Sequence, residues 1–100
     1  MAVRDYEMMY IINPTVADQE ETLEEAINKV HTLITDNGGE IVNVDRWGKR
    51  KLAYEINDIS EGYYVVTKFK IAPSTQTEIN RVLKLNENIV RYMIVNEELN

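Results

Sequence analysis

The sequence contains no cysteine, and its 100 residues include only one histidine, one tryptophan, one phenylalanine and two prolines. A chain without cysteine has no disulfide, no thiolate ligand for a metal ion and no cysteine nucleophile. It also lacks an apolar run long enough to span a bilayer, and no signal-like segment precedes the first patterned strand. These absences predict a cytoplasmic protein that has no membrane partner.

A net positive charge is also missing. The sequence carries 17 acidic and 11 basic residues, for a formal net charge of −6, whereas domains that bind nucleic acid by bulk electrostatics are usually strongly basic. The charges are unevenly distributed, because acids gather between Asp18 and Glu25 and at Glu97 and Glu98, whereas bases gather in 46–51. If these groups lie on different faces, one face attracts phosphate and the other repels it.

Length and periodicity predict one domain over 1–96, followed by a short acidic tail at 97–100. Alternating residues in 4–12 indicate a strand, and Asn13-Pro14 ends it. Leu23, Ile27, Val30 and Ile34 then form one helical stripe. An expected capping box at Asp18 and Glu21 begins this helix, and Gly38 and Gly39 end it.

The second half repeats the pattern. A strand over 40–44 meets an irregularity at Trp47-Gly48, where glycine suggests a bulge, and resumes over 52–56. Turn residues at 57–62 indicate a hairpin to a strand over 63–71. A second expected capping box, at Thr75 and Glu78, starts a helix with Ile79, Val82 and Leu83 on its inner face, and 89–95 forms the last strand.

This β-α-β-β-α-β order predicts an α+β, ferredoxin-like fold. Both helices should cover one face of a four-stranded antiparallel sheet of order 4-1-3-2, which leaves the other face open. An exposed patch that mixes Tyr, Met and Val with cations suggests that a partner covers it. The predicted protein-partner face consists of Met9, Tyr64, Val66, Lys68 and Met93.

The same fold serves enzymes, metabolite sensors and RNA-binding modules, so the fold alone assigns no function. An acylphosphatase-like reaction needs a phosphate-binding loop with an arginine after the first strand, and 13–16 has neither glycine nor a cation. His31 has no nucleophile partner, and carboxylates in a first helical turn are usually solvated capping groups. Base stacking as in an RNA-recognition motif is disfavoured because Met9 stands where an aromatic residue is wanted. We therefore expect no catalytic or metal site, no cofactor and no small-molecule substrate.

The basic segment Arg46-Trp47-Gly48-Lys49-Arg50-Lys51 leads directly into the alternating strand Leu52–Ile56. Cations held on a sheet lose less conformational freedom on binding a phosphate backbone than cations on a tail. Lysine and arginine also protect strand edges from pairing, which is the more common use of such residues. From these residues alone the two interpretations stay equally open.

The run from Gly48 to Ile56, followed by Gly62-Tyr63-Tyr64, resembles the signature segment of the bacterial small-subunit ribosomal protein S6 family. Arg4-Asp5-Tyr6-Glu7 with Asn13-Pro14, and the closing 88–93, are similar to the first and last strands of that family. The resemblance covers essentially the whole chain. It implies a structural, non-enzymatic protein of the cytoplasmic ribosome that binds 16S ribosomal RNA on the platform of the small subunit and pairs with ribosomal protein S18.

Carried over residue by residue, the resemblance and the basic segment together predict RNA contacts through Arg4, Arg46, Lys49, Arg50, Lys51 and Arg91. The free protein is then expected to be a monomer that binds RNA weakly by itself. An alternative function is a ferredoxin-like regulatory domain that homodimerises through its open sheet face. A small-molecule hydrolase is a third possibility.

Overall fold

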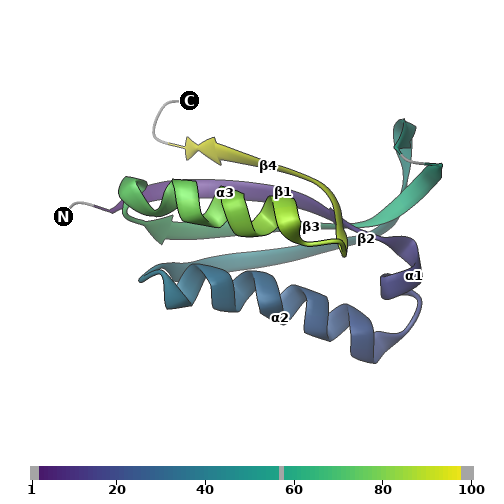
Figure 1. Cartoon of the computed structure of the whole chain (residues 1–100), viewed down its shortest axis with the longest axis horizontal. Helices are drawn as coiled ribbons and strands as arrows, with labels where there is room; N and C mark the ends of the chain where they lie inside the picture. Colours follow the sequence, from purple (N-terminus) through teal and green to yellow (C-terminus); the bar gives the residue numbers. More distant parts are fainter. Residues whose placement is uncertain (1–2, 57, 98–100) are drawn as a thin grey trace.

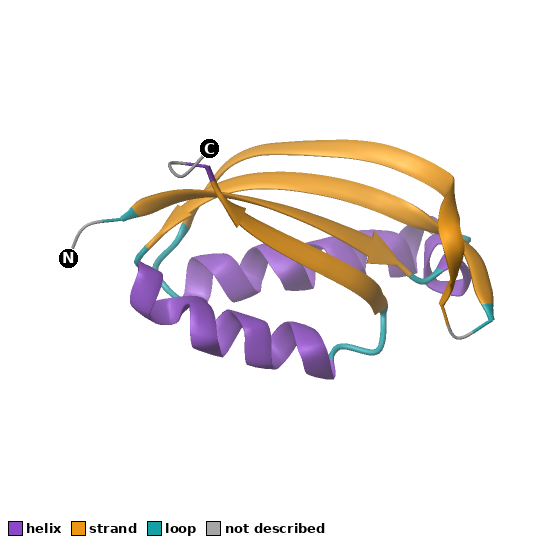
Figure 2. Ribbon diagram, turned by 90° about the horizontal axis from the view of Figure 1, so that it is seen from above, coloured by secondary structure: helices purple, strands orange, loops and turns teal. Residues whose placement is uncertain are grey.

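A computed structural model describes residues 3–56 and 58–97. Its layers are a four-stranded antiparallel sheet and, on one face, two long helices (Figures 1 and 2). The strand order β2-β3-β1-β4 confirms the predicted topology. In chain order the elements are β1 (Arg4–Ile12), α1 (Pro14–Ala17), α2 (Glu20–Asp36), β2 (Glu40–Ile56), β3 (Ile59–Ile71), the 3-10 turn η1 (Pro73–Thr75), α3 (Gln76–Leu85) and β4 (Ile89–Asn96).

The core lies between the sheet and the two helices. The predicted stripe of α2 is buried, and so are Ile79 and Leu83 of α3, whereas Val82 is only half-buried. From Val65 to Ile71, strand β3 alternates strictly: Val65, Thr67, Phe69 and Ile71 are buried, and the residues between them face the other side of the sheet. Burial of these apolar surfaces on one side determines which way each strand faces.

Both predicted capping boxes are absent. Helix α2 begins after Gln19, and no side chain caps its first turn. Thr75 likewise makes no cap for α3, because its hydroxyl donates to the Ala72 carbonyl, 2.7 Å away. Asp18 instead accepts from Lys49 at 2.6 Å, and Glu78 accepts from Arg81 at 2.8 Å. A capping box predicted from spacing alone therefore gave way to stronger charged hydrogen bonds.

Helix α1 was not predicted. Asn13 caps it, since its side-chain oxygen accepts from the Thr15 amide at 3.0 Å, and Pro14 occupies the first helical turn. Asparagine at the cap and proline just inside the helix are both favoured at helix starts. The Asn13-Pro14 pair thus ends β1 as expected and also starts a single turn that leads to Asp18.

Strand β2 is one long strand of 17 residues, and its pairing with β3 shifts register between Arg46 and Gly48. Gly48 has a φ of +84°, which confirms the predicted bulge at this glycine. Strand β3 begins at Ile59, four residues earlier than expected, because the hairpin closes where Ile56 pairs with Ile59. The resulting arm of paired strands extends beyond the helices (Figure 2).

The last strand ends at Asn96, next to the expected boundary between the 1–96 domain and the tail. Residues 98–100 of the tail lie outside the described residues, and the division itself stays a prediction. Within residues 3–56 and 58–97, no helix is both long enough and apolar enough to cross a membrane.

Candidate nucleic-acid and protein interface

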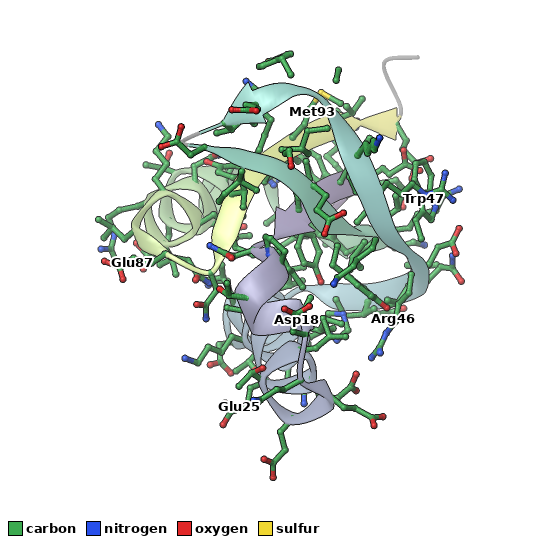
Figure 3. All side chains as sticks on the ribbon, turned by 90° about the vertical axis from the view of Figure 1, so that its right-hand side faces the viewer. Asp18, Glu25, Arg46, Trp47, Glu87 and Met93 are labelled. Atoms are coloured by element: carbon green, nitrogen blue, oxygen red, sulfur yellow. The ribbon has the colours of Figure 1, made fainter. Side chains whose placement is uncertain are left out.

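The bulge in β2 divides the basic segment between the two faces of the sheet. Side chains three residues apart on a regular strand point to opposite faces. Here Arg46 pairs with Val65 and Lys49 with Tyr63, so the extra residue of the bulge brings both cations to the helix side. In Figure 3, Arg46 accordingly lies on the side of Asp18, apart from its sequence neighbour Trp47. The expectation of one basic cluster around Gly48 was therefore wrong.

On the helix side, each of these two cations has an acidic partner. Arg46 donates two hydrogen bonds to Glu24 of α2, at 2.5 and 2.9 Å, and Lys49 donates to Asp18 at 2.6 Å. The hydrogen bond from Arg46 lowers the pKa of Glu24, and the hydrogen bond to Asp18 raises the pKa of Lys49. All four side chains keep 40–56% of their surface exposed, so these are solvent-screened pairs at the molecular surface.

On the other face, Trp47 forms a stack that sequence reasoning missed. Its ring lies nearly parallel to that of Tyr64, at 6.4 Å between centroids, and the Arg50 guanidinium lies 5.3 Å from the Trp47 ring. The indole nitrogen donates to Asp45 at 3.1 Å, which orients the ring. Trp47 is 42% exposed, a large value for a residue of this size. The sequence signal that could have indicated this stack is the position of the only tryptophan, inside the basic segment.

The five residues of the predicted protein-partner face lie on the face of the sheet opposite the helices. Val66, Met9 and Met93 lie in one row across β3, β1 and β4, because Met9 pairs with both of the others. Tyr64 lies in the neighbouring row, and Lys68 lies beyond Val66, with its ammonium 3.8 Å from Glu97. Met93 is 55% exposed, and no helix of the described residues covers this face (Figure 2). The five residues therefore share one mixed apolar and charged surface.

The outer half of β2 curls over one end of this open face, which was not expected. Together with Ile11 and Met9, it lines a small hollow of about 180 Å³. Arg91 of β4 donates to the Tyr54 hydroxyl, and its guanidinium lies 5.2 Å from the Tyr54 ring. Ile11, placed on the open face by its parity, is only 6% exposed as a result. The arm of the hairpin thus buries part of the surface that the sequence left open.

The remaining predicted RNA contacts lie at two different places. Lys51 follows Arg50 on the hairpin arm and is exposed. Arg4 is exposed at the start of β1, where it pairs with Ile71, at the end of the sheet away from the bulge. The structure therefore brings Arg50 and Trp47 together and joins Arg91 to the hairpin arm, but it does not gather the six predicted cations in one patch.

Other surfaces offer less chemistry. A groove of about 850 Å³ runs between α2 and α3, lined by residues such as Leu33, Val82 and Glu87. His31 lies in α2 and is half-buried, and burial lowers the pKa of its imidazole, with a smaller contribution from Arg46. Among the residues that the structure describes, His, Asp and Glu side chains nowhere form a group of three that could hold a metal ion.

Comparison with known proteins agrees with this architecture. The family model described as ribosomal protein S6 matches residues 5–96. The chain belongs to the ribosomal protein S6 family. Small ribosomal subunit protein bS6 of Desulforamulus reducens is 46% identical over 95 residues, which are 95% of this chain and 98% of that protein. The protein of the same name from Clostridium novyi is 43% identical over 96 residues, covering 96% and 99% of the two chains.

The S6 fold is also seen in a solved structure. The crystal structure of 30S ribosomal protein S6 from Thermotoga maritima superposes with a TM-score of 0.88 at 33% identity, covering 98% of this chain and 92% of that chain. The resemblance found in the sequence and the ferredoxin-like fold are thereby confirmed. As a member of the S6 family, the chain is a protein of the small ribosomal subunit, which also confirms the predicted location on the cytoplasmic ribosome.

Proposed function

We propose that this S6 family chain is a structural, non-catalytic component of the small subunit that binds 16S ribosomal RNA jointly with ribosomal protein S18. The free chain is a monomer, and it binds RNA through phosphate and sugar contacts rather than by reading base edges. The observation that carries the proposal is the stack beside the bulge, in which Arg50 lies over the Trp47 ring and Trp47 packs against Tyr64. This stack makes a basic edge and an apolar sheet face one continuous surface.

The RNA-binding part of the proposal rests on the exposed cations of the hairpin and the sheet ends. Arg50 and Lys51 lie on the arm beyond the bulge, and Arg91 is anchored to the same arm through Tyr54. Side chains held by ring contacts have fewer conformations to lose when they bind phosphate. Arg4, Arg46 and Lys49 complete the proposed set, the last two after exchange of their acidic partners.

The partner part of the proposal rests on the row formed by Val66, Met9 and Met93. Apolar side chains gathered on one face, with charges at the margin, are the usual composition of a protein interface. A net charge of −6 also favours joint binding, because an acidic surface complements a basic partner and repels RNA from the other faces. The chain alone should therefore bind RNA weakly.

The RNA contacts are tested with a Lys49→Ala/Arg50→Ala variant, which removes one cation from each face of the sheet. Each lost phosphate contact should flatten the slope of log K against log salt by roughly 0.7 to 0.9. Binding to 16S ribosomal RNA in the presence of S18 is measured over a range of salt concentrations. An Arg81→Ala/Lys84→Ala variant, on α3, changes the net charge equally and should keep the slope. An unchanged affinity and slope for the first variant would leave these residues only a role in edge protection.

The partner face is tested with Val66→Asp and Met93→Asp, each of which adds a charge to the centre of the open face. Both side chains are partly or largely exposed, so the fold should persist while association with S18 is lost. Leu85→Asp is the matched control, because Leu85 is 70% exposed on α3, away from this face. Light scattering of the free chain tests the monomer. A tight homodimer without RNA would favour the regulatory alternative over the ribosomal proposal.

A further inference from the structure

Two of the proposed RNA-binding cations are already bound by acids of the same chain. Arg46 and Glu24 form a two-point contact at 2.5 and 2.9 Å, and Lys49 and Asp18 a one-point contact at 2.6 Å. The partners are 22 and 31 residues apart in the sequence, so only the fold brings them together. The bulge at Gly48 is what turns both cations toward these acids.

A carboxylate and an RNA phosphate bind arginine and lysine through the same donor atoms. The guanidinium of Arg46 uses both terminal nitrogens on Glu24, which is the geometry it would use on a phosphate. An RNA backbone therefore obtains the two-point contact of Arg46, or the donor that Lys49 gives to Asp18, only when it displaces Glu24 or Asp18. The displaced carboxylate then lies close to the phosphate and repels it.

We propose that Asp18 and Glu24 act as intramolecular competitors that hold Arg46 and Lys49 in a low-affinity state toward RNA. The inference rests on the proposed RNA-binding function, and it assigns the acids of the α1–α2 edge a role in lowering RNA affinity. RNA that is offered without additional contacts, such as a flexible homopolymer, displaces the acids poorly. RNA that is also bound through the hairpin arm and through a protein partner has the additional free energy to displace them.

The exchange is energetically feasible because both pairs are exposed. Their four side chains keep 40–56% of their surface accessible. The equilibrium constant that favours such an exposed pair over its separated members is at most about five. Removing both acids should therefore raise RNA affinity by about 2- to 30-fold, the product of two such factors. Larger effects would need buried pairs, which these are not.

The test compares an Asp18→Asn/Glu24→Gln variant with the unmodified chain, using poly(U) and intact 16S ribosomal RNA as probes at fixed salt. The variant should bind poly(U) about 2- to 30-fold more tightly. The gain on the 16S RNA in the presence of S18 should be of about the same size, because the same two pairs are broken in both complexes. The matched control is Asp36→Asn/Glu87→Gln, which removes one exposed aspartate at the end of α2 and one exposed glutamate just after α3, and so makes the same change in net charge. The control should leave poly(U) affinity nearly unchanged.

A second comparison traces the gain to its cause. When Arg46→Gln and Lys49→Gln are added to the Asp18→Asn/Glu24→Gln variant, the gain should disappear, because the cations that the acids release are then absent. An equal gain in the control, a gain that survives loss of the cations, or weaker binding by the acid variant would overturn the inference. Such results would leave the proposed function intact, which fails separately if the unmodified chain does not bind 16S RNA with S18.

Discussion

Substitution of Gly62 by alanine should destabilise the protein through one overlap at the base of the hairpin arm. Gly62 lies opposite Arg50 in the pairing of β2 and β3 and is buried. A Cβ atom there would lie 2.3 Å from Cγ2 of Ile11 and 3.3 Å from the Ile12 carbonyl oxygen. Carbon atoms prefer separations of about 3.5–4.0 Å, so the overlap with Ile11 exceeds roughly 1 Å.

Ile11 cannot easily move away. It lies in β1, which is hydrogen-bonded to β3 on one side and β4 on the other, and only 6% of its surface is exposed. Relief needs a strained rotamer or a local spreading of strands, which for an overpacked site costs about 1–3 kcal/mol. In a chain of this size each kcal/mol lowers the melting temperature by roughly 4–8 °C. We therefore expect Gly62→Ala to lower it by about 4 to 24 °C.

The assay is thermal and urea unfolding followed by circular dichroism, applied as a double-mutant cycle with Ile11→Ala. Ile11→Ala alone should cost about 2–5 kcal/mol, because it leaves a cavity. In that background the overlapping methyl group is gone, so Gly62→Ala should cost less than about 0.5 kcal/mol. If Gly62→Ala is equally costly in both backgrounds, or costs nothing in the unmodified chain, the steric explanation is refuted.

Two further predictions follow from single residues. The pKa of His31 should lie below its ordinary value of 6.5, so the unfolded chain binds more protons near that pH and the free energy of unfolding should fall as the pH drops through 6.5. Because Arg46 contributes to the shift, Arg46→Gln should raise the pKa of His31, which proton NMR of the sole histidine can measure. An unchanged titration would exclude this coupling. Trp47 is the only tryptophan, and it is 42% exposed beside Tyr64. Its fluorescence emission should shift to shorter wavelength when S18 covers the open face. An emission maximum that does not move on complex formation would place the partner elsewhere.

The element order could be read from the sequence because each signal is local. Alternation in β1 and the spacing of Leu23, Ile27 and Val30 each bury one face, and the structure buries those faces. Gly38 ends α2 with a φ of +83°, a conformation that glycine adopts without steric penalty. In these places neighbouring residues determine the backbone, and the tertiary structure agrees with them.

The roles of Asp18 and the candidate site could not be read in this way. Local spacing predicted a capping box, but the carboxylate of Asp18 accepts from Lys49, 31 residues away, at 2.6 Å. The same holds for Arg91, which the fold joins to Tyr54 across 37 residues. Contacts of this length depend on the register of β2 and on the curl of its outer half, and neither has a local signature.

The sequence by itself determined the four strands, the two long helices, their order and the family, because periodicity and turn residues act over a few positions. Only the tertiary structure decided where the charges of 46–51 point. The physical reason is the extra residue at the bulge beside Gly48: it keeps Arg46 and Lys49 on one face and brings Trp47 and Arg50 together on the other. On a regular strand with the same residues, Arg46 and Lys49 would lie on opposite faces, and so would Trp47 and Arg50.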